Sequence, residues 1–218
     1  MKGLLSLIVL SYKRPEMLKD CIDSIRGNID FPTEIIVGDD TSQNADLLLE
    51  YLKNDRISKL ILNSGRNRGI GMNLQNCLGV AEGEYVLKTD ADIVFQEKWA
   101  HECIGILENN PDVTTLNLFN YSHYDENDTR FKITEERSDC FIVSDFVNSC
   151  YLFRKSQIPV QIIPDDGMHG LFYGKKAITK RDLVKNVGFG IPASVYVTLN
   201  DKGEPVKTPT SNHPNIII

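Results

Sequence analysis

Residues 4–17 read LLSLIVLSYKRPEM, and this stretch sets the interpretation of the whole chain. Its first seven residues are apolar apart from one serine, which is typical of a strand buried on both faces of a parallel sheet. A short polar loop follows, and Pro15 then stands where a first helical position accepts a proline. Apolar residues recur at helical spacing from Met17 to Ile25. The stretch therefore predicts a strand, a loop and a helix in succession.

The same alternation continues through the first half of the chain. Further apolar strands are predicted over residues 34–38, 57–62, 84–89 and 113–119. Helical patterns lie between them, and repeated strand–helix–strand units imply a parallel sheet with helices on both faces. Ligands bind such sheets at the carboxyl ends of the strands, so we expect a site there. The polar residues at those ends are Tyr12, Asp39, Asp40, Arg68, Asp90 and Asp92.

The second half has a less regular pattern. Residues 120–139 are polar and predict a long surface loop, while residues 141–153 predict strand structure with a break near residue 148. Residues 175–185 have helical character and a local excess of basic side chains. Residues 195–199 predict a last strand, and the proline-containing tail after them is expected to be irregular.

Composition excludes several classes of protein. The 218 residues are 41% hydrophobic and 25% charged, which is typical of a soluble globular protein. No apolar run is long enough to span a bilayer, and the first strand lacks the features of a signal peptide. The net charge of −6 argues against nonspecific nucleic-acid binding. The cysteines are odd in number and form no Cys-x-x-Cys, which favours reduced, buried thiols and a cytoplasmic location. They are Cys21, Cys77, Cys103, Cys140 and Cys150.

A candidate metal-binding motif is Asp90-Ala91-Asp92, at the end of a buried strand, although an Asp-x-Asp alone is a weak signal. Two carboxylates at this spacing can leave the sheet together and hold Mg²⁺ or Mn²⁺, which prefer oxygen ligands. Such an ion commonly bridges the protein to the phosphates of a substrate. The alternative is that Asp92 only caps a turn.

Three other loops carry candidate ligand contacts, each with a structural alternative. Asp39 and Asp40 could accept hydrogen bonds from a base or ribose, or these residues and the next two could cap the following helix. Residues 67–71 could place backbone N–H groups and Arg68 near a diphosphate, or form an ordinary glycine-containing loop. Tyr12 could stack on a nucleobase, or be an ordinary surface tyrosine.

Taken in order, these motifs resemble the family 2 glycosyltransferases. The set comprises Ser-Tyr-Lys-Arg-Pro after the first strand, Glu-Ile-Ile-Val-Gly-Asp-Asp-Thr-Ser from residue 34, Asn67-x-Gly, Ala81-x-Gly-Glu-Tyr and Asp90-Ala-Asp. The resemblance covers residues 3–110. It implies an α/β fold of the GT-A type, a Rossmann-like α/β/α sandwich with a mostly parallel central sheet and an irregular C-terminal half.

The resemblance also implies a single domain. Residues 1–110 would form its nucleotide-sugar-binding half and residues 111–218 its acceptor side. Within the first half, Tyr12 would lie against the nucleobase, and Asp39 or Asp40 would hold the base or ribose. Arg68 would lie near the base and diphosphate, and Arg14 is counted with these donor contacts.

Asp90 would touch the ribose and the metal, and Asp92 would coordinate the metal. Relatives also carry a late histidine as a metal ligand, for which His169 and His213 are the candidates. The ion, Mn²⁺ or Mg²⁺, would stabilise the charge that develops on the departing nucleoside diphosphate.

The general base is the point at which the second half departs from the family. An acidic pair is expected near residues 174–176, where the sequence has Gly-Lys-Lys. Asp165 and Asp166 lie slightly upstream and are the candidates for the base, while a turn at Pro164-Asp-Asp-Gly is the alternative. The glycine-containing segment 165–174 is a candidate lid.

The residues and the resemblance together predict a metal-dependent glycosyltransferase, and the resemblance implies that it inverts the configuration at the anomeric carbon. The donor would be a nucleotide-diphosphate sugar, and the acceptor a glycan or another hydroxyl-bearing molecule. The basic segment 175–185 keeps a nucleic-acid acceptor open, although such a run is usually a solvated helix face. One alternative is a binding module of the same fold that lacks a base. Another is a nucleotidyltransferase of the same fold, which would need a glycine-rich phosphate loop after the first strand, whereas residues 11–15 contain no glycine.

Overall fold

The structure is a computed structural model of the chain. The residues it describes are 3–40, 44–63, 69–96, 98–120, 131–145, 149–157, 174–187, 195–199 and 205–209.

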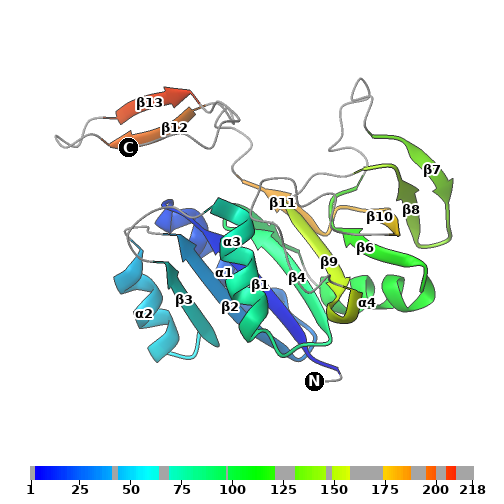
Figure 1. The fold of residues 1–218 in the computed structure, drawn as a ribbon, viewed down its shortest axis with the longest axis horizontal. Helices are drawn as coiled ribbons and strands as arrows, with labels where there is room; N and C mark the ends of the chain where they lie inside the picture. Colours follow the sequence, from blue (N-terminus) through cyan, green and yellow to red (C-terminus); the bar gives the residue numbers. More distant parts are fainter. Residues whose placement is uncertain are drawn as a thin grey trace.

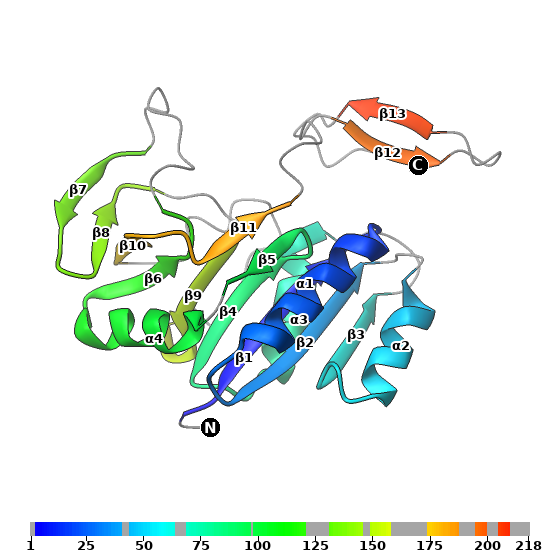
Figure 2. The ribbon, with the colours of Figure 1, turned by 180° about the vertical axis from the view of Figure 1, so that it is seen from behind.

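The first half alternates strands and helices as the sequence predicts. Its elements are β1 (Leu5–Ser11), α1 (Pro15–Asn28), β2 (Thr33–Asp40), α2 (Ala45–Lys53), β3 (Lys59–Asn63), α3 (Gly69–Val80) and β4 (Tyr85–Asp90). The four strands are parallel and lie in the order β3-β2-β1-β4. α1 and α2 cover one face and α3 the other (Figures 1 and 2). The expected α/β fold with a parallel N-terminal sheet is confirmed.

The second half extends the same sheet with mixed strands. Its elements are β5 (Ile93–Phe95), α4 (Trp99–Asn109), β6 (Val113–Asn117), β7 (Ile133–Glu136), β8 (Cys140–Val143), β9 (Cys150–Arg154), a 3-10 turn (Lys155–Gln157), β10 (Lys175–Thr179), β11 (Val184–Asn186), β12 (Val195–Leu199) and β13 (Pro205–Pro209). Beyond β4 the order is β9-β6-β10-β8-β7, with β6 and β10 parallel and the other pairs antiparallel. β11 pairs with β5, and β12 pairs with β13.

The helix predicted over residues 175–185 is wrong, because this segment forms β10 and β11. β10 lies between β6 and β8, and its apolar centre is buried on both faces of the sheet, with Ala177 in the larger core cluster and Ile178 in the smaller one. The basic side chains that suggested a solvated helix face make ion pairs with neighbouring strands and loops instead. Lys176 Nζ lies 3.0 Å from Asp145 Oδ1, and Lys180 pairs with Glu136.

Two other strands lie in regions expected to be irregular. β7 falls inside the predicted loop 120–139, and all four of its residues are exposed, so no apolar alternation marks it. β13 falls in the tail, where its two prolines occupy the end pairs of the hairpin with β12. Proline is tolerated at such ends because no ladder hydrogen bond is needed there. The strand predicted over residues 195–199 is confirmed as β12.

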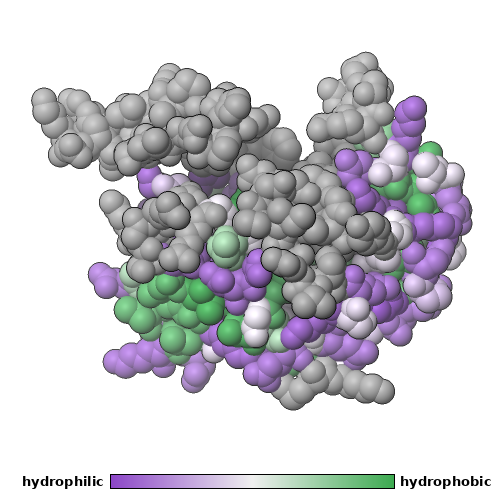
Figure 3. All heavy atoms as spheres, in the orientation of Figure 1, coloured by the Kyte–Doolittle hydropathy of each residue, from purple (hydrophilic) through white to green (hydrophobic). Residues whose placement is uncertain are grey.

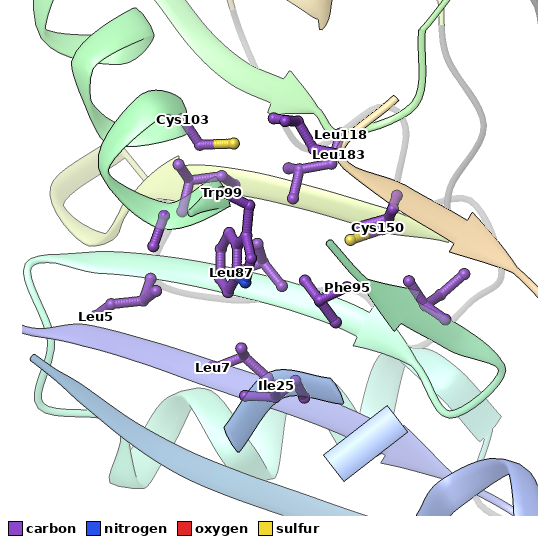
Figure 4. Packing of buried hydrophobic residues seen from close by; sticks show 14 of the residues in the cluster. Leu5, Leu7, Ile25, Leu87, Phe95, Trp99, Cys103, Leu118, Cys150 and Leu183 are labelled. Atoms are coloured by element: carbon purple, nitrogen blue, oxygen red, sulfur yellow. The ribbon is translucent and has the colours of Figure 1, made fainter. Parts of the chain in front are cut away.

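The larger core cluster lies between the sheet and helices α1, α2 and α4. Figure 4 shows Trp99 and Cys103 of α4 over Leu87 of β4, with Leu5 and Leu7 on the neighbouring strand β1. All five cysteines are free thiols in buried positions, which agrees with the expectation of reduced thiols.

β3 is an edge strand of the large sheet. Figure 3 shows an apolar area on the side of the molecule where α2 and β3 lie. The exposed large apolar side chains of α2, β3 and α3 are Leu49, Leu52, Leu62, Ile70 and Val80. Within the described ranges, no helix is both long and apolar enough to cross a membrane.

A polar cluster closes the amino ends of the first strands; we call it the amino-end cluster. The buried Glu34 carboxylate accepts hydrogen bonds from Ser6 Oγ (2.5 Å), from the Glu82 backbone N–H (2.6 Å) and from Lys59 Nζ (2.7 Å). Gly83 N–H donates to Ser6 Oγ at 2.8 Å. Burial alone would raise the pKa of Glu34, but the hydrogen bonds from Lys59, Ser6 and Glu82 outweigh it and lower that pKa.

Candidate donor and metal site

The carboxyl ends of β1, β2 and β4 meet at one edge of the sheet. The register pairs Ser11 with Asp39 and Leu10 with Asp90, so the ends of these neighbouring strands lie level. The polar residues that the sequence placed after separate strands are therefore close in space. This is the edge at which open α/β sheets bind ligands.

The loop after β1 has a strained backbone. Lys13 and Arg14 have φ of 60° and 58°, which is the left-handed region that non-glycine residues rarely adopt. The Asn44 amide ties the loop to the start of α2 by donating to the carbonyl oxygen of Lys13 at 3.1 Å and to Ser11 Oγ at 3.4 Å. Lys13 Nζ lies 5.1 Å from the centre of the Tyr12 ring. The loop thus presents a half-buried aromatic ring and two cations at the strand ends.

Asp90 and Asp92, which we call the carboxyl-end pair, have different surroundings. Arg14 Nη1 lies 3.4 Å from Asp92 Oδ2, and Lys88 Nζ lies 2.6 Å from Asp90 Oδ1. Asp92 Oδ1 is buried and has no hydrogen-bond partner among the described residues. Burial, and next the charge of Asp90, raise the pKa of Asp92, and Arg14 only partly offsets them. Within the described ranges, Asp92 therefore has a buried carboxylate oxygen that no group satisfies, close to a second carboxylate.

These oxygens fit a divalent cation. A buried carboxylate oxygen without a partner is costly, and a bound cation would supply the missing interaction. Mg²⁺ and Mn²⁺ prefer such hard oxygen ligands and keep other positions for water or substrate phosphates. Nowhere in the described residues do three or more His, Cys, Asp or Glu side chains gather in a metal-binding arrangement. The carboxyl-end pair could thus supply only part of a coordination shell.

The backbone around the carboxyl-end pair is held by the second half of the chain. Asp90 N–H donates to the carbonyl oxygen of Ser149 at 3.0 Å, just before β9. Val187 N–H donates to the carbonyl oxygen of Asp92 at 2.9 Å, just after β11. The antiparallel pairing of β11 with β5 continues this support beyond Asp92.

Asp39 and Asp40 are both buried at the end of β2, but the structure separates their surroundings. Asp40 Oδ2 accepts a hydrogen bond from Gly69 N–H, at the first residue of α3, at 2.9 Å. Asp40 therefore caps a helix, although not the following one as the alternative supposed; the N-cap of α2 is Asn44. A carboxylate at this point also interacts favourably with the helix dipole.

α3 lies close to β2 because residue 38 is glycine. A Cβ at Gly38 would collide with the side-chain amide of Asn73 and would lie 2.6 Å from Cys77 Sγ. Asn73 Nδ2 donates to the Gly38 carbonyl oxygen at 2.8 Å. This close approach fixes the N-terminus of α3 beside the end of β2.

Several sequence-predicted site residues lie outside the described residues, and their roles stay predictions. They are Arg68, Asp165, Asp166, His169 and His213.

Sequence reasoning missed Lys88. It counted residues 84–89 as one apolar strand, yet the Lys88 side chain is fully buried and its ammonium holds Asp90. The available signal was a single lysine inside a buried strand, two residues before an aspartate and so on the same face of the sheet.

The architecture defines the class of the protein as a GT-A-like α/β fold. Among solved structures, GalNAc-T7 with UDP, GalNAc and Mn²⁺ is similar with a TM-score of 0.63 and 13% identity, over 81% of this chain and 42% of that chain. S. aureus TarS 1–349 in complex with UDP-GlcNAc is similar with a TM-score of 0.59 and 17% identity, over 83% of this chain and 57% of that chain. The third is the mannosyltransferase PcManGT from Pyrobaculum calidifontis in complex with GDP-Man and Mn²⁺. Its TM-score is 0.57 and its identity 18%, over 82% of this chain and 54% of that chain. At these identities the likeness shows the fold alone.

The family follows from the sequence comparison. The model of glycosyl transferase family 2 matches residues 6–180, which is most of the chain. The chain therefore belongs to glycosyl transferase family 2.

Two curated relatives resemble part of the chain. The uncharacterized glycosyltransferase MJ1057 of Methanocaldococcus jannaschii is 30% identical over 131 residues, 58% of this chain and 44% of the relative. The putative glycosyltransferase EpsH of Bacillus subtilis is 29% identical over 119 residues, 54% of this chain and 33% of the relative. The matched region thus spans less than half the length of either relative.

Proposed function

We propose that this chain transfers a sugar from a nucleotide-diphosphate donor to an acceptor hydroxyl, with inversion and with Mn²⁺ or Mg²⁺. The observation that carries the proposal is the carboxyl-end pair, in which Asp92 Oδ1 is buried without a hydrogen-bond partner among the described residues. Membership of glycosyl transferase family 2 supports the reaction class. The position of the pair at the ligand-binding edge of the sheet supports its role.

The nucleoside would lie between the ends of β1 and β2. Tyr12 offers a half-buried ring for stacking, and Asp39 offers a buried carboxylate for N–H or O–H donors of the base or ribose. Asp40, which accepts a hydrogen bond from Gly69 N–H at the N-terminus of α3, is the second candidate for this contact. Arg68 belongs to the same proposal through its place just before α3.

The diphosphate would lie near the carboxyl-end pair. Asp92 would hold the metal ion directly through its unsatisfied oxygen, and Asp90 would contact the ion and the ribose. The ion, when bound, would neutralise charge on the diphosphate leaving group. Arg14 Nη1 lies 3.4 Å from Asp92 Oδ2, and its guanidinium would contact diphosphate oxygens as well.

The acceptor side would come from residues 111–218. Asp165 or Asp166 would remove the proton of the attacking hydroxyl, and His169 or His213 would complete the metal ligands. Segment 165–174 would act as a lid. These assignments rest on the family pattern, and the acceptor they imply is a glycan or another hydroxyl-bearing molecule.

A donor panel tests the proposal. The protein is incubated with UDP-, GDP-, CMP- and dTDP-sugars in Mn²⁺, Mg²⁺ or EDTA, and nucleotide release is recorded. We expect metal-dependent release from one donor, lost in Asp92→Asn and kept in Asp20→Asn, which changes an exposed aspartate of α1. Inverted anomeric configuration in the product would support the stereochemistry.

Other results would change the assignment. Metal-dependent binding of a donor without any turnover would favour a binding module that lacks a base. Release of pyrophosphate from a nucleoside triphosphate and a sugar phosphate would favour a nucleotidyltransferase. Asp165→Asn and Asp166→Asn, compared in the same assay, would identify the base as the position whose loss stops transfer but leaves donor binding intact.

A further inference from the structure

Lys88 has surroundings that are unusual for a lysine. Its side chain is fully buried in the middle of β4, and it pairs in register with Ile8 of β1 on one side and Tyr151 of β9 on the other. Ile8 and Tyr151 belong to the apolar cluster under α3. An ammonium in such a place loses its hydration, which costs several kcal/mol unless partners replace the water.

The Lys88 ammonium contacts a carboxylate of the proposed donor site. Lys88 Nζ lies 2.6 Å from Asp90 Oδ1 and 5.7 Å from the centre of the Tyr151 ring. The Asp90 side chain is 32% exposed, so the pair reaches from the apolar interior to the open edge of the sheet. The hydrogen bond from Lys88 fixes one oxygen of Asp90 from the buried side of the site.

The charges of the carboxyl-end pair are matched by two cations of the chain. Lys88 holds Asp90, and Arg14 lies beside Asp92, so two carboxylates face two cations. Without the charge of Lys88, the two carboxylates would face only Arg14, and these three groups would carry a net negative charge. A nucleoside diphosphate with one bound Mn²⁺ is also negative, and the two would repel each other.

We propose that Lys88 is a positioning residue of the donor site: its buried ammonium fixes Asp90 and balances the charge of the carboxyl-end pair so that an anionic nucleotide–metal complex can bind. This inference rests on the proposed function, since it concerns the same site. It adds a residue that acts through Asp90 from inside the sheet.

The proposal predicts changes of opposite sign in Lys88→Met, which keeps an unbranched apolar chain of similar length and removes the ammonium group and its charge. Mn²⁺ alone should bind about tenfold more tightly, because the site becomes more negative. The complex of Mn²⁺ with the nucleoside diphosphate should bind about tenfold more weakly, because that complex is itself an anion and Asp90 is no longer fixed. A purely structural role would weaken both or change neither.

The experiment measures both affinities on the full chain. Electron paramagnetic resonance follows free Mn²⁺ during titration, and calorimetry follows UDP, GDP, CDP and dTDP in the presence of Mn²⁺. Lys59→Met is the matched control, because Lys59 forms an ion pair of similar length, 2.7 Å, with Glu34 at the opposite ends of the strands. It should lower the melting temperature and leave both affinities unchanged.

The outcomes separate this inference from the proposed function. If the wild-type chain binds neither Mn²⁺ nor any of the four nucleotides, the proposed function fails, and the inference falls with it. If the wild-type chain binds them and Lys88→Met changes both affinities in one direction or neither, only the inference is overturned.

Lys88→Gln covers the case in which the methionine variant does not fold. Its amide can still donate to Asp90 but carries no charge, so the same opposite changes are expected with smaller size. If every neutral replacement unfolds the protein, Lys88 is required for the fold itself, and the proposal is overturned.

Discussion

The two ends of the first four strands both hold buried carboxylates, but the two sets of carboxylates are treated in opposite ways. At the amino-end cluster, Glu34 accepts hydrogen bonds from Ser6, Glu82 and Lys59, and its pKa is lowered. At the carboxyl-end pair, Asp92 keeps a buried oxygen without a partner among the described residues, and its pKa is raised. Glu34 is satisfied by the protein alone, while Asp92 has one buried oxygen for which the described residues provide no partner.

This difference indicates that the residues that stabilise the fold and the residues proposed to bind a ligand lie at opposite ends of the same strands. Hydrogen bonds to a buried charge stabilise the folded chain, while an unsatisfied charge costs stability and is kept where a ligand supplies the missing partner. Changes at the amino-end cluster should therefore lower stability and spare ligand binding. Changes at the carboxyl-end pair should weaken ligand binding and leave stability unchanged or higher.

The largest expected effect is at the carboxyl-end pair. Under the proposed function, Asp92→Asn should lower donor turnover by at least about a hundredfold, because it would remove a metal ligand worth several kcal/mol in the transition state. The melting temperature without metal should stay equal or rise, since a buried charge is removed. Calorimetric melting and the donor assay measure the two effects, and a large loss of stability would contradict the contrast between the two ends.

A substitution of Gly83 should disrupt the amino-end cluster. A Cβ at this position would lie 2.5 Å from Ser6 N and 2.8 Å from the Leu4 carbonyl oxygen, and backbone atoms cannot move aside cheaply. Gly83→Ala should cost about 3 kcal/mol of the free energy of unfolding.

Gly105→Ala in α4 is the control for Gly83, because a Cβ there meets nothing within 4 Å. It should stabilise the protein by up to about 1 kcal/mol, as alanine favours the helix. Urea unfolding compares the two variants. Equal effects would mean that the close contact at Gly83 is relieved by a backbone shift.

Asp40 sharpens the comparison, because it lies at the functional end and has a structural contact. Asp40→Ala should cost about 1 kcal/mol of stability through loss of the hydrogen bond to Gly69 N–H. Asp20→Ala, on the exposed surface of α1, should change stability by less than about 0.5 kcal/mol. Urea unfolding of both variants decides whether the Asp40 contact contributes to the fold.

The smallest effect is the pH dependence of Glu34. Because its folded pKa lies below the ordinary value of 4.5, the unfolded chain binds more protons in this range, and stability falls as pH falls from 4.5 through the folded pKa. Glu34→Gln should remove that part of the slope. Unfolding free energies of both proteins from pH 6 to pH 3 test this, and identical slopes would assign the acid sensitivity to other groups.

The sequence was sufficient for the fold of the first half because its signals are local. The apolar run at residues 4–10 and the helical spacing from Met17 to Ile25 each fix an element by its own periodicity. The helix expected over residues 175–185 failed for the opposite reason. Its strands depend on neighbours distant in the sequence, and Lys176 takes its partner, Asp145, from another part of the chain.

By itself, the sequence determined the parallel α/β order, the family and the carboxyl-end pair, since strand ends and residue types can be read without knowing contacts. Only the tertiary structure decided that Asp40 holds the N-terminus of α3, that Lys88 holds Asp90, and that one Asp92 oxygen has no partner in the described part of the chain. Each of these depends on which atoms meet across strands and on how far water is excluded. Partner and burial set the role of a charged group, and neither is a property of its position along the chain.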